Sequence, residues 1–388
     1  ANQLRDFASK THVSVSELFA DDIPSYALQI ADFRTVDNAP THDPSPELFD
    51  TIDAMLGRQN WLKNFFLHEG FAPIDFVGSY TDAPLSDEVK NQLVRDLHSF
   101  LKLVDDWASS CKSVADALKM LKDSIEAKGI SVVINGVVND NTHRVLNVSE
   151  FRGFVLADDI APIIFINGRD VKSAQLFTLV HELCHLAFSQ TGVSNASDNG
   201  DTDIAMERFC NSVAADFLVP TRVLVTRWEG CASNQYAKVQ AIARACKVNF
   251  LVVARKVKDV GLIDGETYYS LCSRYEKEKP AEAKPGKGGG NYFYNKQYKL
   301  GSVFSDAIRT AVHSDYLSYR DAYDLTGMSA PSFRRYFEEV AYLWSAISLT
   351  QTSLSRARII YLEIFSRGFG VSSGTCLYRV RRFYIRPF

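Results

Sequence analysis

The sequence predicts an α+β protein in which a small sheet lies beside two metal-bearing helices and is flanked by helical regions. Two observations predict this class. Short runs of β-branched and aromatic residues gather in one stretch, at Ser131–Val138, Phe151–Ala157 and Pro162–Asn167. Apolar residues recur with helical spacing before these runs, at Leu48–Phe71, Leu85–Leu101 and Val114–Ala127, and after them, at Ser173–Phe188, Ile204–Leu218, Tyr236–Gly261 and Val303–Val340.

The composition is that of an ordinary globular protein. The chain has 388 residues, 46% of them hydrophobic and 23% charged, enough for more than one compact unit. A net charge of -3 gives no reason to expect a nucleic-acid partner for the whole surface. The seven cysteines form no Cys-x-x-Cys pair, which fits a reducing compartment and predicts a cytoplasmic protein. No apolar run reaches the length of a membrane span, so we expect no membrane partner.

The segment Phe177–His185 carries the chemistry. It reads Phe-Thr-Leu-Val-His-Glu-Leu-Cys-His, so His181 and His185 are four residues apart and share one helix face. Two imidazoles so placed can hold one Zn²⁺, while Glu182 can reach a water molecule without binding the metal. The alternative is a buried helix with two hydrogen-bonded core histidines. The apolar character of this helix argues against this alternative. Burying three ionisable groups there without a bound ion would cost free energy.

A third metal ligand is available on the next predicted helix. Glu207 lies 22 residues after His185 and would complete a site of two histidines and one glutamate. Asn211, one turn further on, would then orient a ligand histidine. The alternatives are an exposed, non-ligating Glu207 or a carboxylate from Asp201, Asp203 or Asp216. We expect Cys184 and Cys210 to be small packing residues.

Two further segments were interpreted in terms of this site. The strand at Ile163–Asn167 directly precedes the histidine helix and could be an edge onto which an extended peptide adds. His143 and Arg144 lie in a polar turn and could stabilise an oxyanion, although a plain surface turn is at least as good an interpretation. Arg152 is expected to form a structural ion pair with Glu150 or Asp158.

These motifs resemble the ImmA/IrrE metallo-endopeptidases. The resemblance lies in Phe177–His185 and in Glu207–Pro220, and it extends to Glu150–Phe154, Ile163–Asn167 and Tyr319–Tyr323. It implies a zincin-like core, zinc as the cofactor and Glu207 as the third ligand. Cys184 and Cys210 depart from the Gly or Ala usual in the family. The resemblance also implies a protein substrate, a repressor-type transcription factor, and in a longer subgroup a preceding helix-turn-helix unit that would bind DNA.

The chain is predicted to have seven regions. The first, 1–46, is what the resemblance implies to be the remnant of a helix-turn-helix unit, with a linker. It is followed by a helical region at 47–128, the zinc metallopeptidase core at 129–226, a helical hairpin at 227–275, a flexible linker at 276–290, a helical region at 291–340, and an Arg-rich tail at 341–388 without a structural interpretation. The hairpin has six basic residues and no acidic one between 238 and 258. We favour a solvated face, with a helix-turn-helix as the alternative. The aromatic segment Tyr292–Tyr298 is expected to dock on the body.

The predicted function is zinc-dependent cleavage of peptide bonds in a repressor-type transcription regulator. Two other classes of function stay open. One is a DNA-binding transcription regulator whose metallopeptidase part is a sensor or inactive. The other is a structural zinc protein, which Glu182 argues against because a purely structural site has no use for a base.

Overall fold

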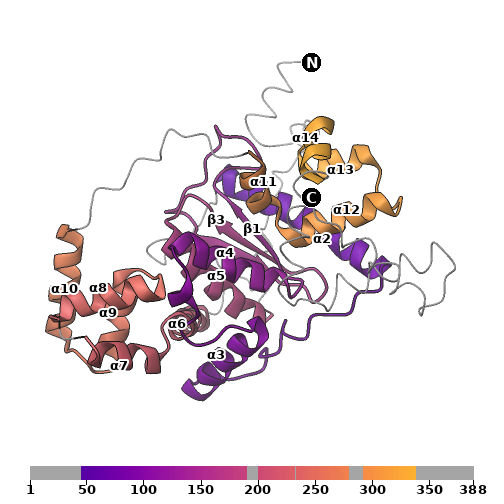
Figure 1. The fold of residues 1–388 in the computed structure, drawn as a ribbon. Helices are drawn as coiled ribbons and strands as arrows, with labels where there is room; N and C mark the ends of the chain where they lie inside the picture. Colours follow the sequence, from indigo (N-terminus) through magenta and orange to yellow (C-terminus); the bar gives the residue numbers. More distant parts are fainter. Residues whose placement is uncertain (1–44, 190–199, 232, 279–291, 338–388) are drawn as a thin grey trace, which may run out of the picture. The chain divides into compact units, whose positions relative to one another are not determined.

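The computed structural model describes residues 45–189, 200–231, 233–278 and 292–337 (Figure 1). The regions predicted at 1–46, 276–290 and 341–388 lie wholly or mostly outside the described residues. Contacts divide the chain into two units, Ala1–Ser329 and Ala330–Phe388. The α-helix described in the second unit is α14 (Ala330–Arg335), and the sheet and the helices that carry the site belong to the first.

Three short strands form the sheet, in the order β1-β3-β2. They are β1 (Ser131–Asn135), β2 (Gly153–Leu156) and β3 (Ile163–Asn167). β1 pairs parallel to β3, with Val133 opposite Phe165, and β2 pairs antiparallel to β3, with Gly153 opposite Ile166. With the helices around it, this sheet confirms the predicted α+β class and its zincin-like core.

One expectation about the sheet is wrong. Ile163–Asn167 is not an edge strand, because β3 is hydrogen-bonded to β1 on one side and to β2 on the other. All five of its residues are buried, as a strand covered on both faces requires. Among the described strands, β1 and β2 are the edges of the sheet.

Both faces of the sheet contribute to the core. Val132, Ile134, Val155, Ile164 and Ile166 share one buried cluster with side chains of the helices that carry the site. Successive strand residues point to opposite faces, so Phe154 and Phe165 face the other way, and their stacked rings lie 4.9 Å apart. The sheet is therefore a rigid platform for whichever helix lies across it.

The helices before the sheet are α2 (Pro46–His68), α3 (Asp87–Leu101) and α4 (Val114–Glu126), with a 3₁₀ turn at Trp107–Ser110. Serine caps the start of each α-helix, and Ser113 and Asp116 form a capping box at α4. Gln59 of α2 donates hydrogen bonds to the carbonyls of Leu156 and Ala161, which binds this helix to the end of β2.

Two helices follow the sheet, α5 (Lys172–Ala187) and α6 (Gly200–Leu218). They contact each other extensively, and α5 also lies against β2 and β3 (Figure 1). The apolar spacing predicts a helix that starts at Ile204, but α6 already begins at Gly200. Intrinsic propensity was a poor guide in this polar stretch, where Gly, Asp and Thr all disfavour helix.

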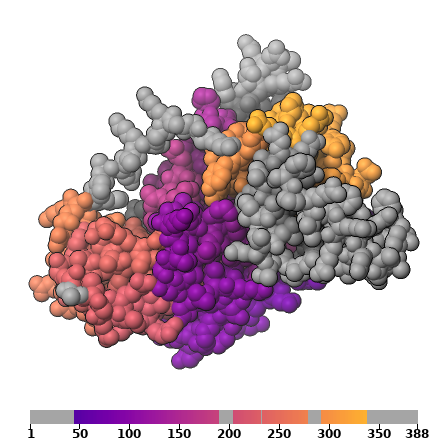
Figure 2. All heavy atoms as spheres, viewed as in Figure 1, coloured from indigo at the N-terminus to yellow at the C-terminus, as the bar shows by residue number. Residues whose placement is uncertain are grey.

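Four further helices form a contiguous region beside the core: α7 (Thr221–Glu229), α8 (Gln235–Cys246), α9 (Phe250–Asp259) and α10 (Gly265–Glu278). In Figure 2 their surface adjoins that of the earlier helices, and α8 contacts the 3₁₀ turn. The pattern at Tyr236–Gly261 is two helices, because Lys247 adopts a left-handed conformation and Asn249 caps α9.

The last helices of the unit are α11 (Tyr292–Leu300), α12 (Ser302–His313) and α13 (Tyr319–Thr326). The predicted docking of the aromatic segment is confirmed, because α11 lies against β1. Lys296 is almost fully buried there and pairs with Asp140. No helix in the described ranges has the length and apolar character needed to cross a bilayer.

Candidate metal centre

Helix α5 holds the two histidines of the motif in a buried position. His181 has no exposed surface, and His185 and Glu182 are each 4% exposed. The start of the helix is fixed to the turn after β3, because the Gln175 amide donates to the carbonyls of Gly168 and Asp170 at 3.1 and 2.6 Å. The apolar residues of α5 pack against the sheet and α6, which holds the two buried imidazoles in fixed positions.

Glu207 of α6 completes the cluster. One of its oxygens, Oε1, lies 2.9 Å from His185 Nε2, and the other, Oε2, lies 3.4 Å from His181 Nε2. The two Nε2 atoms are themselves 2.8 Å apart. Donor atoms of the three residues all lie within 4.8 Å of one another, and each residue is buried. Two imidazoles and a carboxylate converging in this way could hold a metal ion.

The electrostatics of the cluster favour a cation. Burial opposes a charge on His185, but the Cys210 thiol, Glu207 and Glu182 outweigh it and raise the pKa of this imidazole well above its usual value. A positive charge is therefore stabilised between these groups. A divalent ion can replace that proton, since metal ligation requires a neutral imidazole and releases the proton.

The other carboxylates considered as third ligands do not join the cluster. Asp216, on another face of α6, pairs with the nearly buried Lys256 and lies 3.5 Å from Lys90. The side chains of Asp201 and Asp203 lie outside the described residues. Among the described residues Glu207 is thus the carboxylate that meets both histidines.

The two cysteines next to the cluster are fully buried, as expected of packing residues. Cys210 Sγ lies 3.8 Å from the sulfur of Met206, and neither thiol belongs to the group of converging donors. Cys210 also lies near enough to His185 to raise the pKa of its imidazole against the effect of burial, an influence that our sequence reasoning missed. Its position one turn after Glu207, on the helix that faces His185, was the available signal. Asn211 is half-buried, and its role beside a ligand histidine stays a prediction.

Glu182 lies next to the sheet. Its Oε1 is close to Gly153, the first residue of β2, where an added Cβ would stand 3.2 Å from that oxygen. Sequence reasoning did not single out Gly153. A glycine inside a run of strand-forming residues often marks a close approach of another group, and that was the signal available.

The turn before β2 is tied to α2. His143 is exposed in this turn, and its proposed oxyanion role stays a prediction. Arg144 forms ion pairs with Glu47, at 3.2 Å, and with Asp50. These two carboxylates balance its positive charge, so a structural role explains it. Arg152 lies 3.8 Å from Asp170, whereas Glu150 bonds to Ser45 and Asp158 to Lys63. The ion pair expected for Arg152 thus has a different partner.

Most of the basic residues in the α8–α9 hairpin have partners within the chain. The Nζ atom of Lys238 donates to the Trp228 carbonyl, Arg255 pairs with Asp259, and Lys258 lies over the Tyr268 ring. Lys256 is buried on Asp216. These contacts favour a structural or solvated face, the interpretation that we preferred, over a basic surface for DNA.

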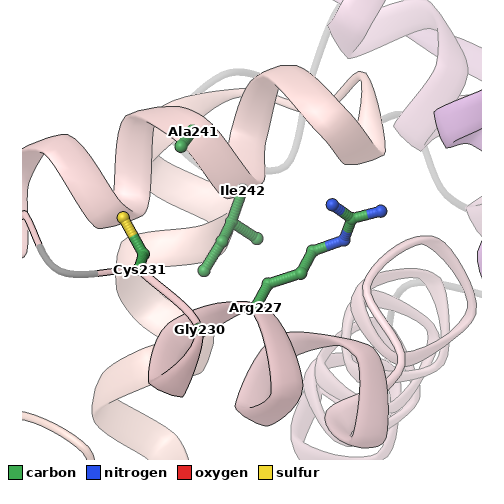
Figure 3. A pocket seen from close by; sticks show the side chains of 5 residues that line it. All are labelled: Arg227, Gly230, Cys231, Ala241 and Ile242. Atoms are coloured by element: carbon green, nitrogen blue, oxygen red, sulfur yellow. The ribbon is translucent and has the colours of Figure 1, made fainter.

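One hollow of 290 Å³ lies between α7 and α8, lined by Arg227, Gly230, Cys231, Ala241 and Ile242 (Figure 3). None of these residues belongs to the histidine–glutamate cluster. Arg227 pairs with Asp106, so its charge is already matched. We assign no function to this hollow.

Comparisons with known proteins identify two regions. Residues 125–258 match the Peptidase_M78 model, described as an IrrE N-terminal-like domain, and residues 300–339 match a domain of unknown function, DUF8813. No curated protein matches the chain. Among matching solved structures, a Mycobacterium tuberculosis transcriptional regulator is 11% identical, with 52% of this chain and 51% of that chain covered and a TM-score of 0.29. The match thus spans about half of that regulator, and the TM-score is too low to support any inference.

Proposed function

We propose that this chain is a zinc-dependent endopeptidase acting on a repressor-type transcription regulator, because residues 125–258 match the Peptidase_M78 model of IrrE N-terminal-like domains. The observation that carries the proposal is the buried cluster of His181, His185 and Glu207, with donor atoms within 4.8 Å of one another. The matched residues contain all three of them and Glu182.

The donor set suits zinc in particular. Zn²⁺ binds imidazole nitrogen and carboxylate oxygen in four-coordinate sites, and a catalytic site supplies three protein ligands and leaves one position open. Ca²⁺ and Mg²⁺ prefer sites made of oxygen ligands, which this cluster is not. The residues present therefore fit zinc as the resident ion.

Glu182 is the base in this proposal. A bound zinc ion would act as a Lewis acid and would lower the pKa of water. Glu182 follows the ligand His181 directly, so its carboxylate points about 100° away around the helix and does not share the ligand face. It accepts a proton from the attacking water and returns that proton to the leaving amine of the peptide. Its near-complete burial excludes bulk water from the carboxylate.

Within the described sheet β2 is paired on one side only, and although its four residues are buried, its other side is where a substrate backbone would add. An extended peptide can add to an exposed sheet edge through main-chain hydrogen bonds. β2 begins at Gly153, beside the carboxylate of Glu182. A peptide strand bound along β2 would pass this base, which supports cleavage within an extended segment. The choice of a repressor as substrate rests on the resemblance to ImmA/IrrE proteins.

A cleavage assay tests the proposal. The full chain, loaded with one equivalent of Zn²⁺, is incubated with purified repressors encoded beside its gene, and the products are identified by mass spectrometry. We expect one internal cut in one repressor, abolished by a zinc chelator and restored by added Zn²⁺. Cleavage that survives complete removal of zinc would contradict the proposal, as would zinc-loaded protein that cuts none of these repressors.

A further inference from the structure

Gly153 occupies a position with no room for a side chain. A Cβ atom added there would lie 2.8 Å from Thr178 Cγ2, 2.9 Å from the Phe165 carbonyl oxygen and 3.2 Å from Glu182 Oε1. The first two distances are shorter than ordinary van der Waals contacts, so a methyl group could enter only if its neighbours moved. One of these neighbours is the backbone of the central strand β3, which cannot yield easily.

Glu182 and Thr178 confine this position from the helix side. They are four residues apart on α5 and so share a face that is turned toward β2. Thr178 is 2% exposed and Glu182 is 4% exposed. The carboxylate therefore lies in a narrow space between its own helix and the bare backbone at the start of β2. The missing side chain at residue 153 sets how close to the strand the carboxylate can lie.

We propose that Gly153 is a positioning residue for Glu182. Its lack of a side chain lets the carboxylate lie against the edge strand instead of being pushed away from it. This inference rests on the proposed function, in which Glu182 is the base. A Cβ at 3.2 Å would force the carboxylate to give way by a few tenths of an ångström, and the action of a catalytic group depends steeply on its position.

The test needs a readout that does not depend on the identity of the substrate. Acetohydroxamate is a suitable probe, because its two oxygens can bind Zn²⁺ while its protons can be accepted by a nearby carboxylate. Its affinity for the zinc-loaded full chain is measured for the parent, Gly153→Ala, Glu182→Gln and the double variant. Zinc content and thermal unfolding are measured in parallel. Gly57→Ala is the matched control, because a Cβ at Gly57 would meet nothing within 4 Å.

We expect Gly153→Ala to keep about one zinc per chain, because its side chain would face Glu182 and none of the three ligands. Acetohydroxamate affinity should fall about tenfold or more in Gly153→Ala and in Glu182→Gln, with no further fall in the double variant. Gly57→Ala should match the parent.

Three results would overturn the inference: parent-like affinity in Gly153→Ala, loss of zinc in that variant, or additive losses in the double variant. The last two would mean that Gly153 shapes the sheet or the metal site and does not act through Glu182. Failure of the proposed function looks different: the zinc-loaded parent would then cut none of the repressors, a result that the affinity comparison does not depend on.

Discussion

Glu182→Gln is expected to abolish peptide hydrolysis while zinc and the fold are retained. The substitution is nearly isosteric, and Glu182 is not among the converging donors of the metal cluster. The amide cannot accept a proton at neutral pH, so we expect the rate to fall by about 10²- to 10⁴-fold. The measurement is kcat for repressor cleavage, together with zinc per chain and the far-ultraviolet circular dichroism spectrum.

A loss of zinc together with activity would show that Glu182 is a ligand, and the roles assigned within the motif would be wrong. Full activity in the amide variant would show that another group accepts the proton. Glu88→Gln is a convenient control, since this carboxylate is exposed in the first turn of α3. It should cleave the repressor at the rate of the parent.

Glu207→Gln is expected to weaken zinc binding and to stop hydrolysis together. A neutral amide is a poor ligand for Zn²⁺, and the loss of one negative charge also weakens the attraction for the cation. Loss of a supporting residue around a metal typically costs about 10–100-fold, so loss of a ligand should exceed about 100-fold in zinc affinity. The measurement is zinc affinity by competition with a chromophoric chelator.

Two other variants of α6 serve as comparisons for the zinc affinity of Glu207→Gln. Asp216→Asn should keep the zinc affinity of the parent, because Asp216 is engaged by Lys256. It should instead lower the free energy of unfolding by about 3 kcal/mol, since Lys256 would remain buried without its partner. Asn211→Ala should lie between Asp216→Asn and Glu207→Gln, with a loss of about 10–100-fold in zinc affinity or activity. If Asp216→Asn loses zinc and Glu207→Gln retains it, the third ligand is misassigned.

Much of the fold and most of the metal cluster were accessible from the sequence. The spacing of His181 and His185 is a local helical property, so the pattern alone brings their rings together. The three strands were found within a few residues of their observed ends because β-branched and aromatic residues mark them clearly. The third ligand required the packing of α6 on α5. The sequence offered Glu207 on the next predicted helix, but only the resemblance to a family favoured it over Asp201, Asp203 and Asp216.

The expectations that failed depended on tertiary pairing. A buried strand has the same apolar residue pattern whether it is central or at an edge of the sheet. The position of Ile163–Asn167 within the sheet could therefore not be predicted from its own residues. The effect of Cys210 on the pKa of His185 and the partner of Arg152 likewise depend on contacts between distant segments.

The central claim is that His181, His185 and Glu207 hold one zinc ion, and X-ray absorption at the zinc edge tests it most directly. The spectrum of the zinc-loaded full chain should show four nitrogen or oxygen neighbours at about 2.0–2.2 Å and the scattering pattern of two imidazoles. It should show no sulfur at about 2.3 Å, although the thiols of Cys184 and Cys210 lie close by. A sulfur neighbour, or zinc surrounded by oxygen alone, would contradict the account.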